Sequence, residues 1–248
     1  MNTTYKPLTI YREGGIRELL YIALPLIMVT FSTQFMLFCD RIILARYSTL
    51  AMSAACSAGT VFSVFQLSII SIAAISEVFV GQYNGAQQYH KIATAVWQMI
   101  WFSLASIIIY LPFGLYGALT FVPPELLHEG APYYRILMYC CPLYDITAAL
   151  SAFYVGRGKV RLVTLITITG DLLNILLDFL LIFGYKDLIF SLGTAGSAIA
   201  TNISQGVIAV SLFLCFLHKK NRQKYYTHHP RFNWPVLKKS LGLYQITR

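Results

Sequence analysis

TITGDLLNILLDFLLIFG, residues 167–184, decides the fold of this chain, because three polar side chains interrupt an otherwise apolar run. Asp171, Asn174 and Asp178 are spaced i, i+3 and i+7, so a helix places them on one face, and Thr167 extends that face by one turn. Such a helix is either a soluble core helix with a costly polar stripe or a membrane helix that lines a hydrated cavity. The rest of the chain distinguishes these two interpretations.

The composition favours the membrane. Of the 248 residues, 57% are hydrophobic and only 12% are charged, whereas soluble domains carry about 25% charged residues. Several apolar stretches are about twenty residues long, which is enough to cross the hydrocarbon core of a bilayer as a helix. These runs are continuous rather than alternating. We therefore predict an all-α polytopic membrane protein and not a β-barrel.

Six apolar segments predict six transmembrane helices that form one bundle, 18–217. Their approximate bounds are 18–45, 51–80, 92–111, 133–155, 162–184 and 193–217. We expect a polar loop at 81–91 and a second loop from Pro112 to Pro132. Outside the bundle we expect a cytoplasmic N-terminal segment (1–17), a basic cytoplasmic linker (218–239) and the start of a seventh helix (240–248).

Lysine and arginine residues are concentrated in alternate connections. They are frequent before the first predicted helix and after the fourth and sixth, as in GRGKVR (156–161) and in the linker. Cytoplasmic loops carry such an excess, so we predict a cytoplasmic N-terminus and a multi-pass protein of the cell's inner (plasma) membrane, in contact with lipids. The formal net charge of +9 then reflects these loops and not nucleic-acid binding.

Enzymatic and metal signatures are missing from the sequence. The five cysteines lie inside apolar stretches and have no ligand spacing to a histidine, so we interpret them as core residues. The chain contains no GxxxxGK, HExxH or GxSxG motif. We therefore expect neither an enzyme nor a cofactor.

Four carboxylates fall at membrane depth, and they are Asp40, Asp145, Asp171 and Asp178. Each costs about 2.5–3.5 kcal/mol at the centre of a membrane helix. A hydrated cavity lowers this cost, and carboxylates in it can take up a proton or bind Na⁺ together with amide and hydroxyl oxygens. That is the chemistry of an ion-coupled carrier. Thr33, on the face of Asp40, and Gln66 are further candidates for the cavity wall, together with Asp145 and Asp171.

Three of these acids could have a structural role instead of a functional one. Asp40 is near a helix end and could pair with Arg41 or Arg46, two arginines that can also extend to the outer interface. Asp145 follows Pro142 and could stabilise a kink, and Asp171 could support a polar contact between helices. Asn174 and Asp178 lie one turn apart in mid-helix with no interface to reach, so they are the strongest candidates for a cation site.

Several stretches resemble one transporter family. NILLDFLLIFG (174–184) followed by GTAGSAIATNISQG (193–206) is similar to the fifth and sixth helices of multidrug and toxic compound extrusion (MATE) transporters. ALPLIM (23–28), with the aspartate that follows it before the outer turn, resembles their first helix. VGQYNGAQQYHKI (80–92) resembles the loop after their second helix. The resemblance extends over about 17–248.

The resemblance implies a specific fold and function. MATE transporters have twelve helices in two six-helix bundles around a central cavity, and they exchange H⁺ or Na⁺ for drugs and other organic cations. Their cation site in the N-terminal bundle matches Asp40, Asn174 and Asp178 here, with a polar residue early in helix six that matches either Thr201 or Thr194. Asp145 and Asp171 have no assigned equivalent.

The chain is about half as long as the members of that family. The resemblance therefore implies an N-terminal half that needs a C-terminal six-helix half, or a second copy of itself, to transport small organic cations. Two alternatives stay open, namely a flippase for lipid-linked precursors from the same superfamily and an inactive truncated fragment. The acidic rather than basic character of the predicted cavity favours the exporter over the flippase.

Overall fold

The computed structural model describes residues 15–184, 190–230, 232–235 and 237–238. Within these ranges the chain is helical and contains no strand, which confirms the all-α prediction. The helices are α1 (Ile16–Tyr47), α2 (Thr49–Ala74), α3 (Ser76–Gly85), α4 (Tyr89–Ala105), α5 (Ile107–Phe121), the 3₁₀ turn η1 (Pro124–Leu126), α6 (Leu127–Tyr139), α7 (Cys141–Val155), α8 (Val160–Phe183), α9 (Gly193–Phe216) and α10 (Lys219–Tyr225).

These helices combine into membrane-length segments. Five segments are long and apolar enough to span a bilayer, and two of them combine neighbouring helices, α2 with α3 and α4 with α5. The pair α6 and α7, bent by 43°, makes a sixth if it is one span. The break lies at Cys140, two residues before Pro142, since a proline cannot donate to the preceding turn. The side of the membrane that holds the N-terminus stays a prediction, as does the division into bundle and linker.

Two predicted loops are wrong. The helix of α5 continues through Pro112 to Phe121, and helical structure resumes at Pro124, so most of the expected loop between Pro112 and Pro132 is helical. Similarly, α3 reaches Gly85 and α4 starts at Tyr89, inside the expected loop 81–91. Proline and polar residues alone do not end these helices, because membrane helices tolerate proline where neighbouring groups satisfy the freed backbone.

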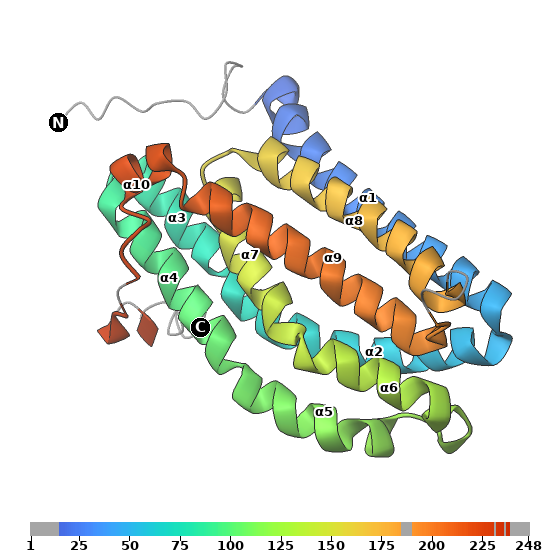
Figure 1. Ribbon diagram of the computed structural model, residues 1–248. Coiled ribbons are helices and arrows are strands. Elements are labelled where there is room, and N and C mark those ends of the chain that lie inside the picture. The colour runs from blue at the N-terminus through green and yellow to red at the C-terminus, as the bar shows by residue number, and fades with distance from the viewer. Residues whose placement is uncertain (1–14, 185–189, 231, 236, 239–248) are drawn as a thin grey trace.

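Helix α8 lies at one side of the bundle (Figure 1). This helix packs between α1 and α9, while α7 lies between α4 and α9 and α6 contacts α2, α5 and α9 (Figure 1). Small residues allow the closest approaches, as in many membrane helix pairs. At Gly196 of α9, a Cβ atom would lie 2.6 Å from the backbone oxygen of Leu181 in α8.

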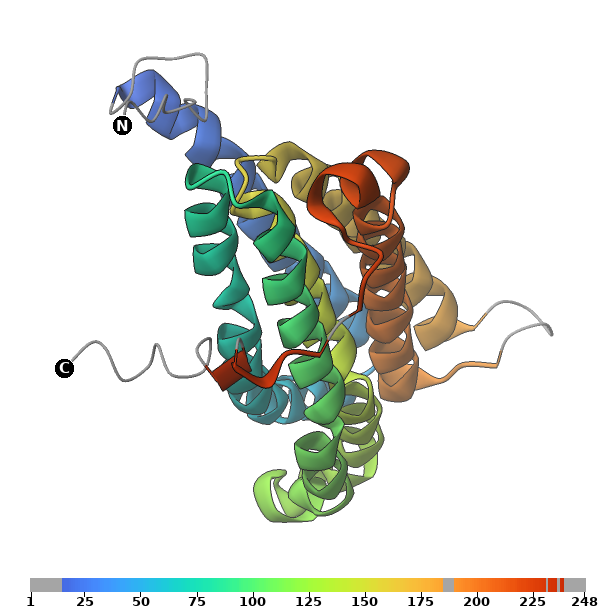
Figure 2. The same ribbon diagram turned by 90° about the vertical axis from the view of Figure 1, so that its left-hand side faces the viewer.

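The segment after α9 folds back onto the bundle instead of extending away from it (Figure 2). The indole nitrogen of Trp97 in α4 donates to the carbonyl oxygen of Thr227 at 3.0 Å, and the backbone nitrogen of Asn233 donates to Gln98 Oε1 at 2.9 Å. The described part of the predicted linker is therefore attached along α4. The predicted seventh-helix start, 240–248, lies outside the described residues, as do residues 1–14.

Arg157, in the α7–α8 connection, joins α10 to the bundle. Its guanidinium lies 3.6 Å from the ring centre of Phe153 and 4.4 Å from that of Tyr225 in α10. Burial lowers the pKa of Arg157. Burial alone would raise the pKa of Tyr225, but the positive charges of Arg157 and Lys224 lower it overall.

The close approach of α8 and α9 gives a direct test of the fold. Gly196→Ala would push a methyl group into the main chain of Leu181, which cannot move without displacing α8. We expect a loss of about 1–3 kcal/mol, typical of overpacking, measured as a lower unfolding temperature of the detergent-purified protein. The matched control is Gly206→Ala on the same helix, where nothing lies within 4 Å. Equal unfolding temperatures for the two variants would contradict this packing.

Candidate functional site

A cavity of about 480 Å³ lies among α1, α2, α6, α7, α8 and α9. Its wall is largely apolar and aromatic, and polar side chains line it at several depths. Six of the eight residues predicted from the sequence belong to this wall, and they are Thr33, Asp40, Gln66, Asp171, Asn174 and Thr201. Six helices thus bring together side chains that are far apart in the sequence.

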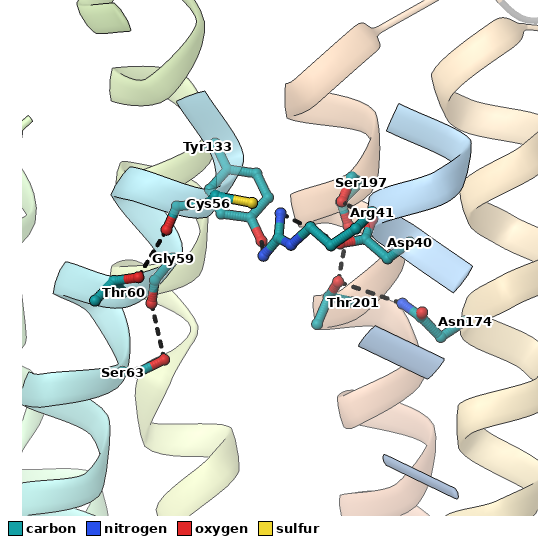
Figure 3. Close-up of polar contacts among 10 residues, drawn as sticks. All are labelled: Asp40, Arg41, Cys56, Gly59, Thr60, Ser63, Tyr133, Asn174, Ser197 and Thr201. Carbon is teal, nitrogen blue, oxygen red and sulfur yellow. Dashed lines mark hydrogen bonds and ion pairs between the residues drawn. The ribbon is translucent and has the colours of Figure 1, made fainter. Parts of the chain in front are cut away.

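Asp40 of α1 is held from two directions (Figure 3). The hydroxyl of Ser197 in α9 donates to Asp40 Oδ1 at 2.6 Å. Asp40 Oδ2 lies 3.5 Å from Nη1 of the next residue, Arg41. Only 2% of Asp40 is exposed, so this ion pair lies inside the protein. Both interactions offset part of the cost of burying a charged carboxylate.

The sequence suggested that Arg41 could extend to the outer interface, but the structure shows it turned into the protein. Its Nη2 donates to the Tyr133 hydroxyl of α6 at 3.3 Å, and its guanidinium lies on the cavity wall (Figure 3). Gly59 of α2 leaves room for it, because a Cβ atom there would be 3.1 Å from Nη2. The pairing with Asp40 was one of the alternatives that the sequence left open, and it coexists with a position of Asp40 in the cavity.

Asn174 connects α8 to α9. Its side-chain amide lies 3.3 Å from Thr201 Oγ1 (Figure 3). With the amide oxygen turned towards the backbone N–H of Thr201 (3.1 Å), the amide nitrogen donates to Asp178 Oδ2 at 2.9 Å. Asn174 and Asp178 therefore contact each other directly, one turn apart, as their spacing predicts.

Asp178 lies behind the cavity wall and is fully buried. Its second oxygen, Oδ1, has no hydrogen-bond donor among the described residues. The carboxyl group is also close enough to Asp40 for the two charges to interact. Arg41 is the one basic side chain on the described cavity wall. Asp40 and Asp178 thus share a single guanidinium, and this leaves room for a bound proton or cation.

The structure distinguishes the two threonines, Thr201 and Thr194, that the sequence left as alternatives. Thr201 faces Asn174, whereas Thr194 lies at the start of α9 and donates to Glu129 of α6. Ser197, one turn before Thr201, was missed altogether. Its spacing of four residues from Thr201 puts both on one helix face, so the pattern was present in the sequence but gave no reason to prefer a serine.

The other two acids lie in different surroundings. Asp171 accepts from Ser32 at 2.6 Å and from Thr33 at 3.3 Å, both in α1, and it lines the cavity. Asp145 does not line the cavity, which corrects that expectation. It is fully buried and accepts from Ser106 at 3.1 Å and from Tyr110 at 3.0 Å, next to the break between α4 and α5.

Comparison with known proteins agrees with this arrangement. A family model described as MatE matches residues 25–180, which is more than half of the chain. The chain belongs to the MatE family. MatE members are transporters and not enzymes, and the chain is a multi-pass membrane protein of this family.

Named relatives include two bacterial proteins. A probable multidrug resistance protein NorM of Thermotoga maritima is 26% identical over 196 residues, which cover 77% of this chain and 42% of that protein. A probable multidrug resistance protein YoeA of Bacillus subtilis is 28% identical over 184 residues, 70% of this chain and 38% of that protein. The chain thus spans less than half the length of these relatives.

Solved structures share the fold of this MatE chain. The eukaryotic MATE transporter AtDTX14 superposes with a TM-score of 0.76 and 20% identity, over 92% of this chain and 50% of that one. An outward-facing multidrug resistance MATE family transporter superposes with a TM-score of 0.73 and 18% identity, over 90% of this chain and 49% of that one. The six-helix arrangement is therefore that of half a MATE transporter.

The contact between Ser197 and Asp40 predicts a loss of stability. Ser197→Ala would remove the 2.6 Å hydrogen bond and leave a buried carboxylate oxygen without this donor. We expect a cost of about 1–2 kcal/mol, seen as an earlier midpoint in unfolding by sodium dodecyl sulfate followed by circular dichroism. Ser204→Ala is the matched control, because the Ser204 hydroxyl on the same helix has no partner in the described structure. A control that is destabilised as much as Ser197→Ala would refute the assignment.

Proposed function

We propose that this chain supplies the cation-binding half of a secondary transporter that exchanges H⁺ or Na⁺ for organic cations. The observation that carries the proposal is the environment of Asp178, which is fully buried, has one oxygen without a donor and lies near Asp40. A proton or Na⁺ bound there would supply the missing partner. The carboxyl, amide and hydroxyl oxygens of Asp40, Asn174 and Thr201 are candidate ligands.

The cavity wall suits an organic cation as the transported substrate. Phe62, Tyr133 and Tyr144 are among its residues, and aromatic faces attract cations. Asp171 adds a carboxyl group to the same wall. A flippase for lipid-linked precursors would need basic residues for a pyrophosphate group, and Arg41, already paired with Asp40, is the one basic residue on the described wall. We therefore favour the exporter.

Transport by this half requires a partner. The chain spans about half the length of its relatives, and alternating access is the movement of one bundle against another around a central site. We propose that a C-terminal six-helix half, or a second copy of this chain, closes the open side of the cavity. The N-terminus lies in the cytoplasm in this proposal, and the membrane is the plasma membrane.

The test has a binding arm and a transport arm. The purified chain is titrated with ²²Na⁺ and, separately, followed for proton uptake with a pH indicator. The chain is then co-reconstituted with a C-terminal six-helix half, and efflux of ethidium is driven by an imposed H⁺ or Na⁺ gradient. Asp178→Asn removes a charged ligand, so we expect about tenfold to a hundredfold weaker ion binding and loss of gradient-driven efflux.

Asp145→Asn is the control, because Asp145 is an equally buried carboxylate outside the cavity. We expect it to retain ion binding and efflux. Unchanged efflux in Asp178→Asn would contradict the proposed role of that residue. If the unsubstituted chain neither binds ions nor supports efflux, the interpretation as an inactive fragment replaces the proposal.

A further inference from the structure

The pair α1 and α8 forms a groove at one end, away from the cavity. Two adjoining hollows of about 380 and 240 Å³ share Tyr21, Pro25 and Arg161. The larger hollow is apolar, and its wall includes Leu20, Leu24, Met28, Leu165 and Ile168. The smaller one contains Lys159 at the start of α8. The groove is thus apolar along most of its length and basic at one end.

The groove opens on the side of α1 and α8 that faces away from the cavity. In α1 the cavity wall uses Leu26, Val29 and Thr33, whereas the groove uses Leu24 and Met28. At about 100° per residue, Leu24 and Met28 lie on the opposite side of the helix from Leu26. In α8 the cavity uses Val163 and Thr167. Leu165 of the groove lies on the opposite side of the helix from both, and Ile168 lies about 100° from Thr167. A second bundle that closes the cavity would therefore leave the groove facing lipid.

The basic end of the groove is exposed. Arg161 and Lys159 are both exposed, and the Arg161 guanidinium lies 4.5 Å from the ring centre of Tyr21 in α1. This stacking fixes the position of the charge without neutralising it, since an aromatic ring is no counter-ion. Lys159 precedes α8 without a side-chain cap, so the N–H groups of the first turn add to the positive potential.

We propose that this groove binds an anionic phospholipid. Its phosphodiester would lie between Lys159 and Arg161, and the upper part of one acyl chain would lie along Leu24, Met28, Leu165 and Ile168. Tyr21 and Met28 are seven residues apart, which is about 10 Å along a helix, within the roughly 15 Å depth of one leaflet's hydrocarbon. Basic pockets between membrane helices bind such headgroups where the leaflet is anionic. The inference does not depend on transport.

Lipid binding can be measured on the intact chain. The detergent-purified protein is titrated with phosphatidylglycerol or phosphatidylcholine, and bound lipid is counted by native mass spectrometry. We expect one phosphatidylglycerol to bind in preference to phosphatidylcholine. The double variant Lys159→Gln/Arg161→Gln should weaken phosphatidylglycerol binding roughly thirtyfold, since each basic residue near an anionic surface contributes a factor of about five.

The control keeps the change in net charge equal. Lys219→Gln/Lys220→Gln removes two exposed positive charges from α10, at a distance from the groove in sequence and on another helix, and we expect binding to be retained. Equal loss in both double variants would overturn the proposal, because attraction would then depend on net charge. Inorganic phosphate that binds as tightly as phosphatidylglycerol in the same titration would overturn it in favour of a small-anion site. Loss of the bound lipid when a C-terminal half is added would overturn it in favour of a protein contact.

Discussion

The cost of carboxylates inside the hydrocarbon constrains the rest of this structure. Asp40 and Asp178 are buried at membrane depth, where each isolated charge is expensive. Asp40 is compensated by Ser197 and Arg41, but Asp178 receives one donor, from Asn174, and keeps an oxygen without a partner in the described structure. A purely structural site would satisfy every oxygen, since unpaired buried polar groups are costly. The incomplete compensation at Asp178 is the feature on which the proposed ion binding depends.

The packing of α8 against α9 determines whether this compensation can form. Gly196 allows the backbones of the two helices to approach, and Ser197, the next residue, then lies within hydrogen-bonding distance of Asp40 in α1. Thr201, one turn later, lies against Asn174. The stability of the bundle and the geometry of the site therefore both depend on the close spacing of α8 and α9. The small residues of GTAGS (193–197) contribute by their lack of volume as much as by their chemistry.

Local sequence patterns predicted the elements of this structure better than the contacts between them. The polar stripe of Asp171, Asn174 and Asp178 follows from helical periodicity, and the all-α membrane fold follows from long apolar runs. Pro112 was misleading because its effect on a helix depends on neighbouring groups that periodicity does not describe. The inward direction of Arg41 depends on Gly59 and Tyr133 from two other helices. Such long-range partners are set by tertiary packing, so a single sequence does not reveal them.

Helices α1 and α8 present acidic and amide side chains on the face towards the cavity and basic side chains on the opposite face. Towards the cavity they present Asp40, Asp171 and Asn174, which favour a cation, and away from it they present Arg161 with Lys159 just before α8. Between the two faces, the Thr164 hydroxyl of α8 lies 3.1 Å from the carbonyl oxygen of Pro25 in α1 and joins the helices. A shift of α1 along α8 would therefore change the acidic cavity and the basic groove together. The proposed ion on one face and the proposed lipid on the other would in this way be linked through one helix pair, because each site needs the same relative position of α1 and α8.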